Sequence, residues 1–96
     1  MGYDILIDGH YASYLATASG WDDAANYIEA HTPRRTPLRR LAEVRETYQP
    51  QQAADMLADL LRDSQPSANI AHTLYVLQRL LKGEHVVIAS GVTAEP

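Results

Sequence analysis

Hydrophobic and polar residues alternate at the start of the chain, which predicts a β-strand over residues 3–8. Asp8-Gly9 follows this strand, and that dipeptide is typical of a two-residue type I′ hairpin turn. The register set by such a turn pairs Ile7 with His10, Ile5 with Ala12, and Tyr3 with Tyr14. We therefore expect an N-terminal hairpin with one face towards the core, made of Tyr3, Ile5, Ile7, Ala12 and Tyr14.

Four later segments have apolar residues every three or four positions, which predicts four helices. Ser19 is the expected N-cap of the first helix, which should end near His31. Pro37, Pro50 and Pro66 mark the starts of the other three. The apolar stripes are, in chain order, Trp21, Ala24, Ala25 and Ile28; Leu38, Leu41, Val44 and Tyr48; Ala54, Leu57, Leu60 and Leu61; and Ile70, Leu74, Leu77 and Leu81.

A β-branched run over residues 85–90 predicts a third strand near the end of the chain. The resulting order is β-β-α-α-α-α-β. Strands at both ends of the sequence favour an α+β fold, in which the N-terminal hairpin and the C-terminal strand form a small three-stranded antiparallel sheet packed against about four helices. The length fits a single domain over residues 1–96, with residues 92–96 as a flexible tail.

The bulk composition restricts the function classes. Apolar residues make up 46% and charged residues 21% of the chain, as in a globular domain. Cysteine is absent, so disulfide frameworks, thiolate metal sites and cysteine nucleophiles are excluded. The first residues do not resemble a signal peptide, and no apolar run reaches the ~18 residues needed to cross a bilayer. We expect a cytoplasmic protein with no membrane partner, no cofactor and no metal site.

The clearest charge feature is a cluster of five arginines, which we expect to bind a partner or an anion. The cluster is made of Arg34, Arg35, Arg39, Arg40 and Arg45. Several of them lie at the start of the second predicted helix, where positive charge opposes the helix dipole and favours a compensating anion. Three alternatives are open: a solvated surface with internal ion pairs, a site for an acidic protein or a second subunit, and a nucleic-acid site.

Two further sets of residues are candidates for an interaction surface. Asp55, Asp59 and Asp63 form an acidic stripe on the third predicted helix, which favours either solubility or docking of a basic partner. The chain has six tyrosines and no phenylalanine, and tyrosine is favoured at interfaces that are partly accessible to solvent. Tyr11, Tyr14 and Tyr75 are accordingly either residues at the margin of the core or part of an exposed face on the hairpin and the fourth helix.

No catalytic or metal-binding motif is visible around the four histidines, His10, His31, His72 and His85. Phosphate-binding loops and nucleophile elbows are also absent from the sequence. An enzyme would need an active site shared across a dimer, with His72 or His10 as its candidate residue. We therefore expect no catalytic residues in this chain.

These features favour a small non-enzymatic module that binds another protein or itself. Small acidic domains of this kind include inhibitors encoded by phages and mobile elements, and this analogy in composition suggests an inhibitor or regulator of a larger assembly. The alternative function is nucleic-acid or phosphate binding through the basic cluster between Arg34 and Arg45.

Overall fold

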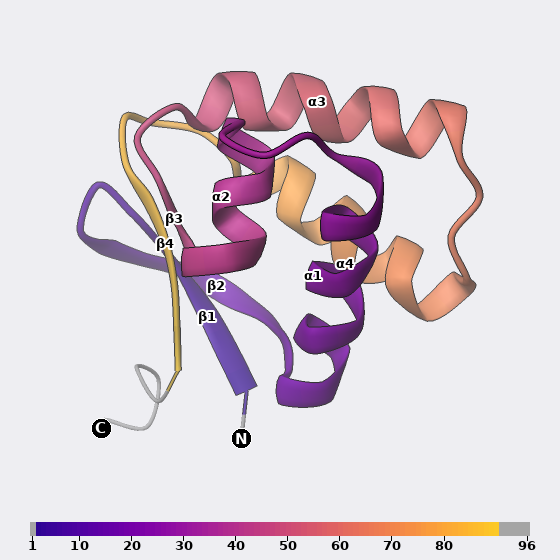
Figure 1. Cartoon of the computed structure of the whole chain (residues 1–96). Coiled ribbons are helices and arrows are strands. Elements are labelled where there is room, and N and C mark those ends of the chain that lie inside the picture. Colours follow the sequence, from indigo (N-terminus) through magenta and orange to yellow (C-terminus); the bar gives the residue numbers. More distant parts are fainter. Residues whose placement is uncertain (1, 91–96) are drawn as a thin grey trace.

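The computed structural model of the chain describes residues 2–90, and it confirms the α+β class. All four helices lie on one side of a four-stranded antiparallel sheet (Figure 1). The elements are, in chain order, β1 (Gly2–Ile7), β2 (His10–Thr17), α1 (Ala18–His31), α2 (Pro37–Val44), β3 (Glu46–Thr47), α3 (Pro50–Asp63), α4 (Ala68–Leu80) and β4 (Val86–Ser90). The tail expected over residues 92–96 lies outside the described residues.

The sheet has the strand order β2-β1-β4-β3, so the expectation of three strands was wrong by one. The additional strand, β3, has only two residues, which is too short to give a periodic signal. Its pairing with β4 joins Glu46 to Val87 and Thr47 to Val86. The amide of Ile88 also donates a 2.8 Å hydrogen bond to the carbonyl oxygen of Arg45, which extends this ladder by one residue.

The hairpin turn is confirmed, but the register predicted beyond it is wrong. Asp8 and Gly9 both have positive φ, at 52° and 85°, as a type I′ turn requires. Ile7 pairs with His10 as expected, but two irregularities in the ladder displace the later pairs. The observed partners are Ser13 for Ile5, Tyr14 for Asp4, and Ala16 for Tyr3. Ala12 and Tyr14 are consequently exposed, while Leu15 and Ala16 face the core.

Most of the helix boundaries predicted from the sequence agree with the structure. α1 ends at His31, α3 begins at Pro50, and Pro37 is the first residue of α2 after its N-cap. The expected N-cap at Ser19 is wrong, because β2 runs directly into the helix and the Thr17 hydroxyl accepts the Gly20 amide at 3.0 Å.

Two other predicted element limits also differ from the structure. Pro66 precedes α4 rather than starting it, since Ser67 is the N-cap of that helix. The apolar stripe of the second helix does not continue through Val44 and Tyr48. Val44 is the last residue of α2 and is exposed there. Arg45 adopts a left-handed conformation with φ of 60°, which ends the helix before Tyr48, and Tyr48 is exposed as well.

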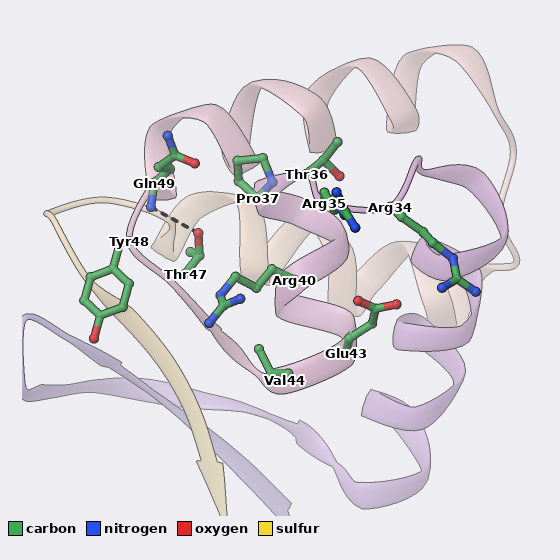
Figure 2. A pocket seen from close by; sticks show the side chains of 10 residues that line it. All are labelled: Arg34, Arg35, Thr36, Pro37, Arg40, Glu43, Val44, Thr47, Tyr48 and Gln49. Atoms are coloured by element: carbon green, nitrogen blue, oxygen red, sulfur yellow. Dashed lines mark hydrogen bonds between the residues drawn. The ribbon is translucent and has the colours of Figure 1, made fainter.

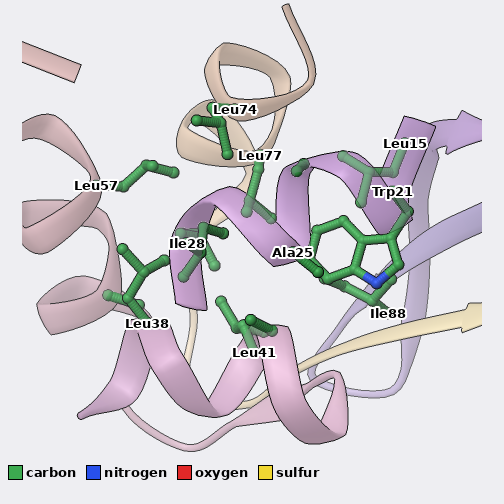
Figure 3. Close-up of a cluster of buried hydrophobic side chains, with 14 of the residues drawn as sticks. Leu15, Trp21, Ala25, Ile28, Leu38, Leu41, Leu57, Leu74, Leu77 and Ile88 are labelled. Carbon is green, nitrogen blue, oxygen red and sulfur yellow. The ribbon is translucent and has the colours of Figure 1, made fainter. Parts of the chain in front are cut away.

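One hydrophobic cluster fills the space between the sheet and the helices (Figure 3). Trp21 and Ile28 of α1 lie at its centre, and Leu41 of α2 packs beside them. Leu57 of α3 and Leu74 of α4 close the side away from the sheet. Because α2 is fixed by this packing through its buried side, its opposite side is presented to solvent.

Candidate anion-binding groove

A surface hollow of about 550 Å³ lies between the start of α2 and the chain segment that leads into α3 (Figure 2). We call it the basic groove, because three of the five clustered arginines line it. Its lining residues are Arg34, Arg35, Thr36, Pro37, Arg40, Glu43, Val44, Thr47, Tyr48 and Gln49. The groove therefore combines residues from the turn before α2, from α2 itself, from β3, and from the two residues that follow β3.

The turn that carries Arg34 and Arg35 is fixed by its own hydrogen bonds. The Thr36 hydroxyl donates to the carbonyl oxygen of Pro33 at 2.9 Å and accepts the amide of Arg39 at 3.4 Å. Arg35 has a positive φ of 65°, which turns the chain sharply into α2. These contacts shape the backbone from which the Arg34 and Arg35 side chains line the groove.

Arg39 is used inside the protein, although it belongs to the same cluster in the sequence. Its guanidinium donates to the carbonyl oxygens of Glu29 and Thr32, at 3.0 Å and 2.9 Å, and to the Glu43 carboxylate at 2.9 Å. The side chain is only 14% exposed. Arg39 thus joins the start of α2 to the C-terminal end of α1, where positive charge is favourable.

Arg45 is also occupied, at the opposite end of α2. Its guanidinium donates to the Tyr3 hydroxyl at 2.8 Å and lies over the Tyr3 ring, 5.0 Å from the ring centroid. It lines a different hollow, together with Trp21 and Asp22. The five predicted residues consequently separate into two that hold the fold together and three that line the basic groove.

Arg34, Arg35 and Arg40 are exposed to solvent. Within residues 2–90, no hydrogen bond or ion pair joins their guanidinium groups to another side chain. Glu43 is the acid that lines the groove, but it is paired with Arg39. The groove therefore has a net positive charge, in a protein whose formal net charge is −4.

A cluster of three side chains adjoins the groove, and no sequence pattern predicts it. His85 Nε2 lies 2.5 Å from Glu46 Oε2, and the Tyr48 ring stacks on the His85 ring with centroids 4.2 Å apart. The Tyr48 hydroxyl also interacts with the Glu46 carboxylate. Contacts with His85 and then with Tyr48 lower the pKa of Glu46, while the interaction with Glu46 raises the pKa of Tyr48.

The loop that carries His85 is held by Asp8 from the hairpin turn. One carboxylate oxygen of Asp8 accepts the backbone amides of Glu84 and His85, each at 2.9 Å. Gly83 precedes them with a φ of 79°, and a Cβ atom there would meet the Asp8 carboxylate at 2.5 Å. The position of His85 thus depends on contacts between residues that are far apart in the sequence.

The acidic stripe on α3 does not meet the basic groove through any ion pair within residues 2–90. Arg62 instead pairs with Asp59 and Asp63, each at 3.0 Å, and Asp63 chiefly raises the pKa of Arg62. Asp55 accepts a 3.3 Å hydrogen bond from Gln51. These acids form an exposed face, and Arg62 neutralises part of its negative charge.

The predicted tyrosines are exposed, but they do not form one surface. Tyr11 and Tyr14 are paired with Leu6 and Asp4 of β1, so they lie on the face of the sheet that the helices leave open. Tyr75 lies on the exposed side of α4. About half of each of these three side chains is accessible to solvent.

The other three histidines are dispersed over the fold. His10 begins β2, and His31 bonds to the carbonyl oxygen of Tyr27 at 2.8 Å. His72 lines a hollow of about 570 Å³ between β2 and α4. Among the described residues, no group of three His, Cys, Asp or Glu side chains is placed to hold a metal ion. Within the same residues, no helix is long and apolar enough to cross a membrane.

Comparison of the chain with protein-family models, with curated proteins and with solved structures gives no match. The function of the chain is therefore inferred from its own residues and their geometry.

Proposed function

We propose that this chain is a protein-binding module whose basic groove takes an acidic segment of a partner protein. One observation carries the proposal: Arg34, Arg35 and Arg40 line one groove and have no ion pair within the described residues. Five arginines and one glutamate lie between positions 34 and 45, against three cations and eleven acids elsewhere. Such a concentration of one sign favours binding of the opposite charge.

The chemistry of the lining fits carboxylate groups. A guanidinium can bind a carboxylate through two parallel hydrogen bonds, and these charge-assisted bonds are stronger than neutral ones. Val44 and Tyr48 line the same groove with 53% and 64% of their side chains exposed. They offer apolar contact to side chains between the acids, and tyrosine and arginine are both enriched at protein interfaces.

The charge distribution favours a protein over nucleic acid as the partner. Duplex and single-stranded nucleic acids require several phosphate contacts along an extended path. The basic groove provides three arginine side chains, and the chain around it is acidic. A short acidic peptide segment can contact the three arginines without approaching the acidic remainder of the surface.

The test is a binding titration with rhodamine-labelled deca-aspartate, followed by fluorescence anisotropy at low salt. Replacing Arg34, Arg35 and Arg40 with Gln should weaken binding about tenfold or more, since each lost charged contact contributes roughly 0.5–1 kcal/mol. The three cations outside the arginine cluster supply a control with the same net charge, the triple variant R62Q/R79Q/K82Q. This control should keep an affinity close to that of the wild type.

Two results would overturn the proposal. Equal loss of affinity in both triple variants would show that only the overall charge matters. Tighter binding of decathymidylate than of deca-aspartate would overturn the protein partner and support the nucleic-acid alternative.

A further inference from the structure

We propose that Glu46 sets the affinity of the basic groove, and that protonation of His85 removes its inhibitory charge. This inference rests on the proposed function and concerns the regulation of the same groove. Its basis is geometric: β3 and β4 place Glu46, Tyr48 and His85 together on the sheet face that has no helix. Tyr48 belongs to this cluster and also lines the groove.

The pairing of the strands explains why these side chains meet. Thr47 is opposite Val86 and both are buried, so the residues on either side of them point to the other face of the sheet. Glu46 of β3 and Tyr48, the residue after β3, therefore flank His85. The two rings lie nearly parallel, with 6° between their planes, and Glu46 and His85 are each about one-third exposed.

Tyr48 connects this cluster to the groove. Its ring stacks on His85, its hydroxyl interacts with Glu46, and the residue is 64% exposed and lines the groove. Arg40 lines the groove as well, and its charge acts on both Glu46 and Tyr48. The negative charge of Glu46 is therefore felt where an anionic ligand would bind.

The charge at this end of the groove depends on the state of His85. With a neutral imidazole, Glu46 remains an anion that attracts Arg40 and repels an incoming carboxylate. With a protonated imidazole, the Glu46–His85 pair has no net charge, and Arg40 is available to the ligand. Since a histidine side chain changes its charge between about pH 5 and 8, binding should strengthen as the pH falls through this range.

The other charged groups near His85 do not reproduce this effect. Asp8 accepts the His85 amide, and Glu84 precedes His85 in the same loop. Carboxylic acids ordinarily titrate near pH 4, so a deca-aspartate ligand keeps its charge above pH 6. Arginine stays protonated throughout. Asp8 and Glu84 are unchanged in every variant tested, so they do not account for a difference in pH dependence between the variants.

The experiment measures deca-aspartate affinity from pH 6.0 to 8.5, at constant ionic strength, for the wild type and for Glu46→Gln. We expect the wild type to bind about threefold to tenfold more tightly at the lower pH, the effect of one unit charge at short range near the surface. Glu46→Gln should bind at the upper pH about as tightly as the wild type does at the lower pH, because in both cases the net negative charge beside Arg40 has been removed.

Two further variants separate this mechanism from a general effect of histidine. His85→Gln cannot take up a proton, so it should bind weakly at every pH. His10→Gln removes a different exposed histidine, and it should keep the pH dependence of the wild type. Circular dichroism of each variant checks that the fold is retained.

The possible failures are distinguishable. Absence of deca-aspartate binding by the wild type at every pH would overturn the proposed function together with this inference. Binding that requires Arg34, Arg35 and Arg40 but is unaffected by pH or by Glu46→Gln would overturn this inference alone.

Discussion

The guanidinium of Arg39 donates a 2.9 Å hydrogen bond to the backbone carbonyl oxygen of Thr32, just beyond the end of α1. Arg40, the next residue in the sequence, lies on the exposed side of α2 and lines the basic groove. Adjacent arginines thus have different roles, because successive residues of a helix point about 100° apart. The difference leads directly to a prediction about stability.

Replacing Arg39 with Gln should destabilise the protein by about 1.5–3 kcal/mol, the usual contribution of hydrogen bonds to a charged group. The variant loses its bonds to two backbone carbonyl oxygens and its pair with Glu43. Urea denaturation followed by circular dichroism measures the change. Arg40→Gln is the matched control and should stay within about 0.5 kcal/mol of the wild type. The same urea midpoint for both variants would contradict the structural role of Arg39.

Gly83→Ala should be more destabilising than Gly9→Ala. Both glycines have positive φ, so alanine introduces backbone strain of roughly 1 kcal/mol or more at either position. Only at Gly83 would the new Cβ atom also meet other side chains, with Asp8 at 2.5 Å and Ile7 at 2.8 Å. The measurement is thermal unfolding of the two variants. Equal losses would show that Asp8 does not confine the loop before β4.

Glu46 should stabilise the protein in a pH-dependent manner. Its pKa is lowered in the folded state, so its contribution is complete above the ordinary glutamate pKa and is lost as the pH falls through the lowered value. The urea midpoints of the wild type and Glu46→Gln should therefore differ at pH 6 and converge in strong acid. A difference that stayed constant down to pH 3 would contradict the contact with His85.

Tyr48 should ionise at higher pH than an ordinary tyrosine, because the interaction with Glu46 raises its pKa. The phenolate absorbance of the wild type minus that of Tyr48→Phe isolates its titration. Glu46→Gln should move this titration back to lower pH. Since a raised pKa stabilises the folded state below the ordinary value, the contribution of Tyr48 should be lost as the pH rises through its titration. An unchanged titration in Glu46→Gln would exclude the interaction.

The sequence predicted the parts of the fold that depend on local signals. Thr36-Pro37 marked the start of α2, and Pro50 marked the start of α3, because proline is favoured in the first turn of a helix. The Asp8-Gly9 turn was found for a similar reason, since both positions need positive φ. The sequence does not identify Thr17 as an N-cap, because α1 follows β2 directly and no loop residues separate the two elements.

The candidate groove was only partly visible in the sequence. The arginine cluster could be recognised, but the separation of Arg39 and Arg45 from the other three depends on which side of α2 faces α1. Glu46 and His85 are 39 positions apart, and they meet through a two-residue strand that has no periodicity. Val44 and Tyr48 fit a helical stripe in the sequence, but the left-handed residue Arg45 ends α2 between them, so Tyr48 reaches the groove from outside the helix.

The most direct test of the central claim is an NMR titration that follows the side-chain Nε–Hε signals of the arginines as deca-aspartate is added. If the basic groove is the binding site, the signals of Arg34, Arg35 and Arg40 shift together and saturate. The signals of Arg39 and Arg45, which are held by Thr32 and Tyr3, should change little. Shifts spread evenly over all arginines, or concentrated on Arg62 and Arg79, would contradict a binding site in the basic groove.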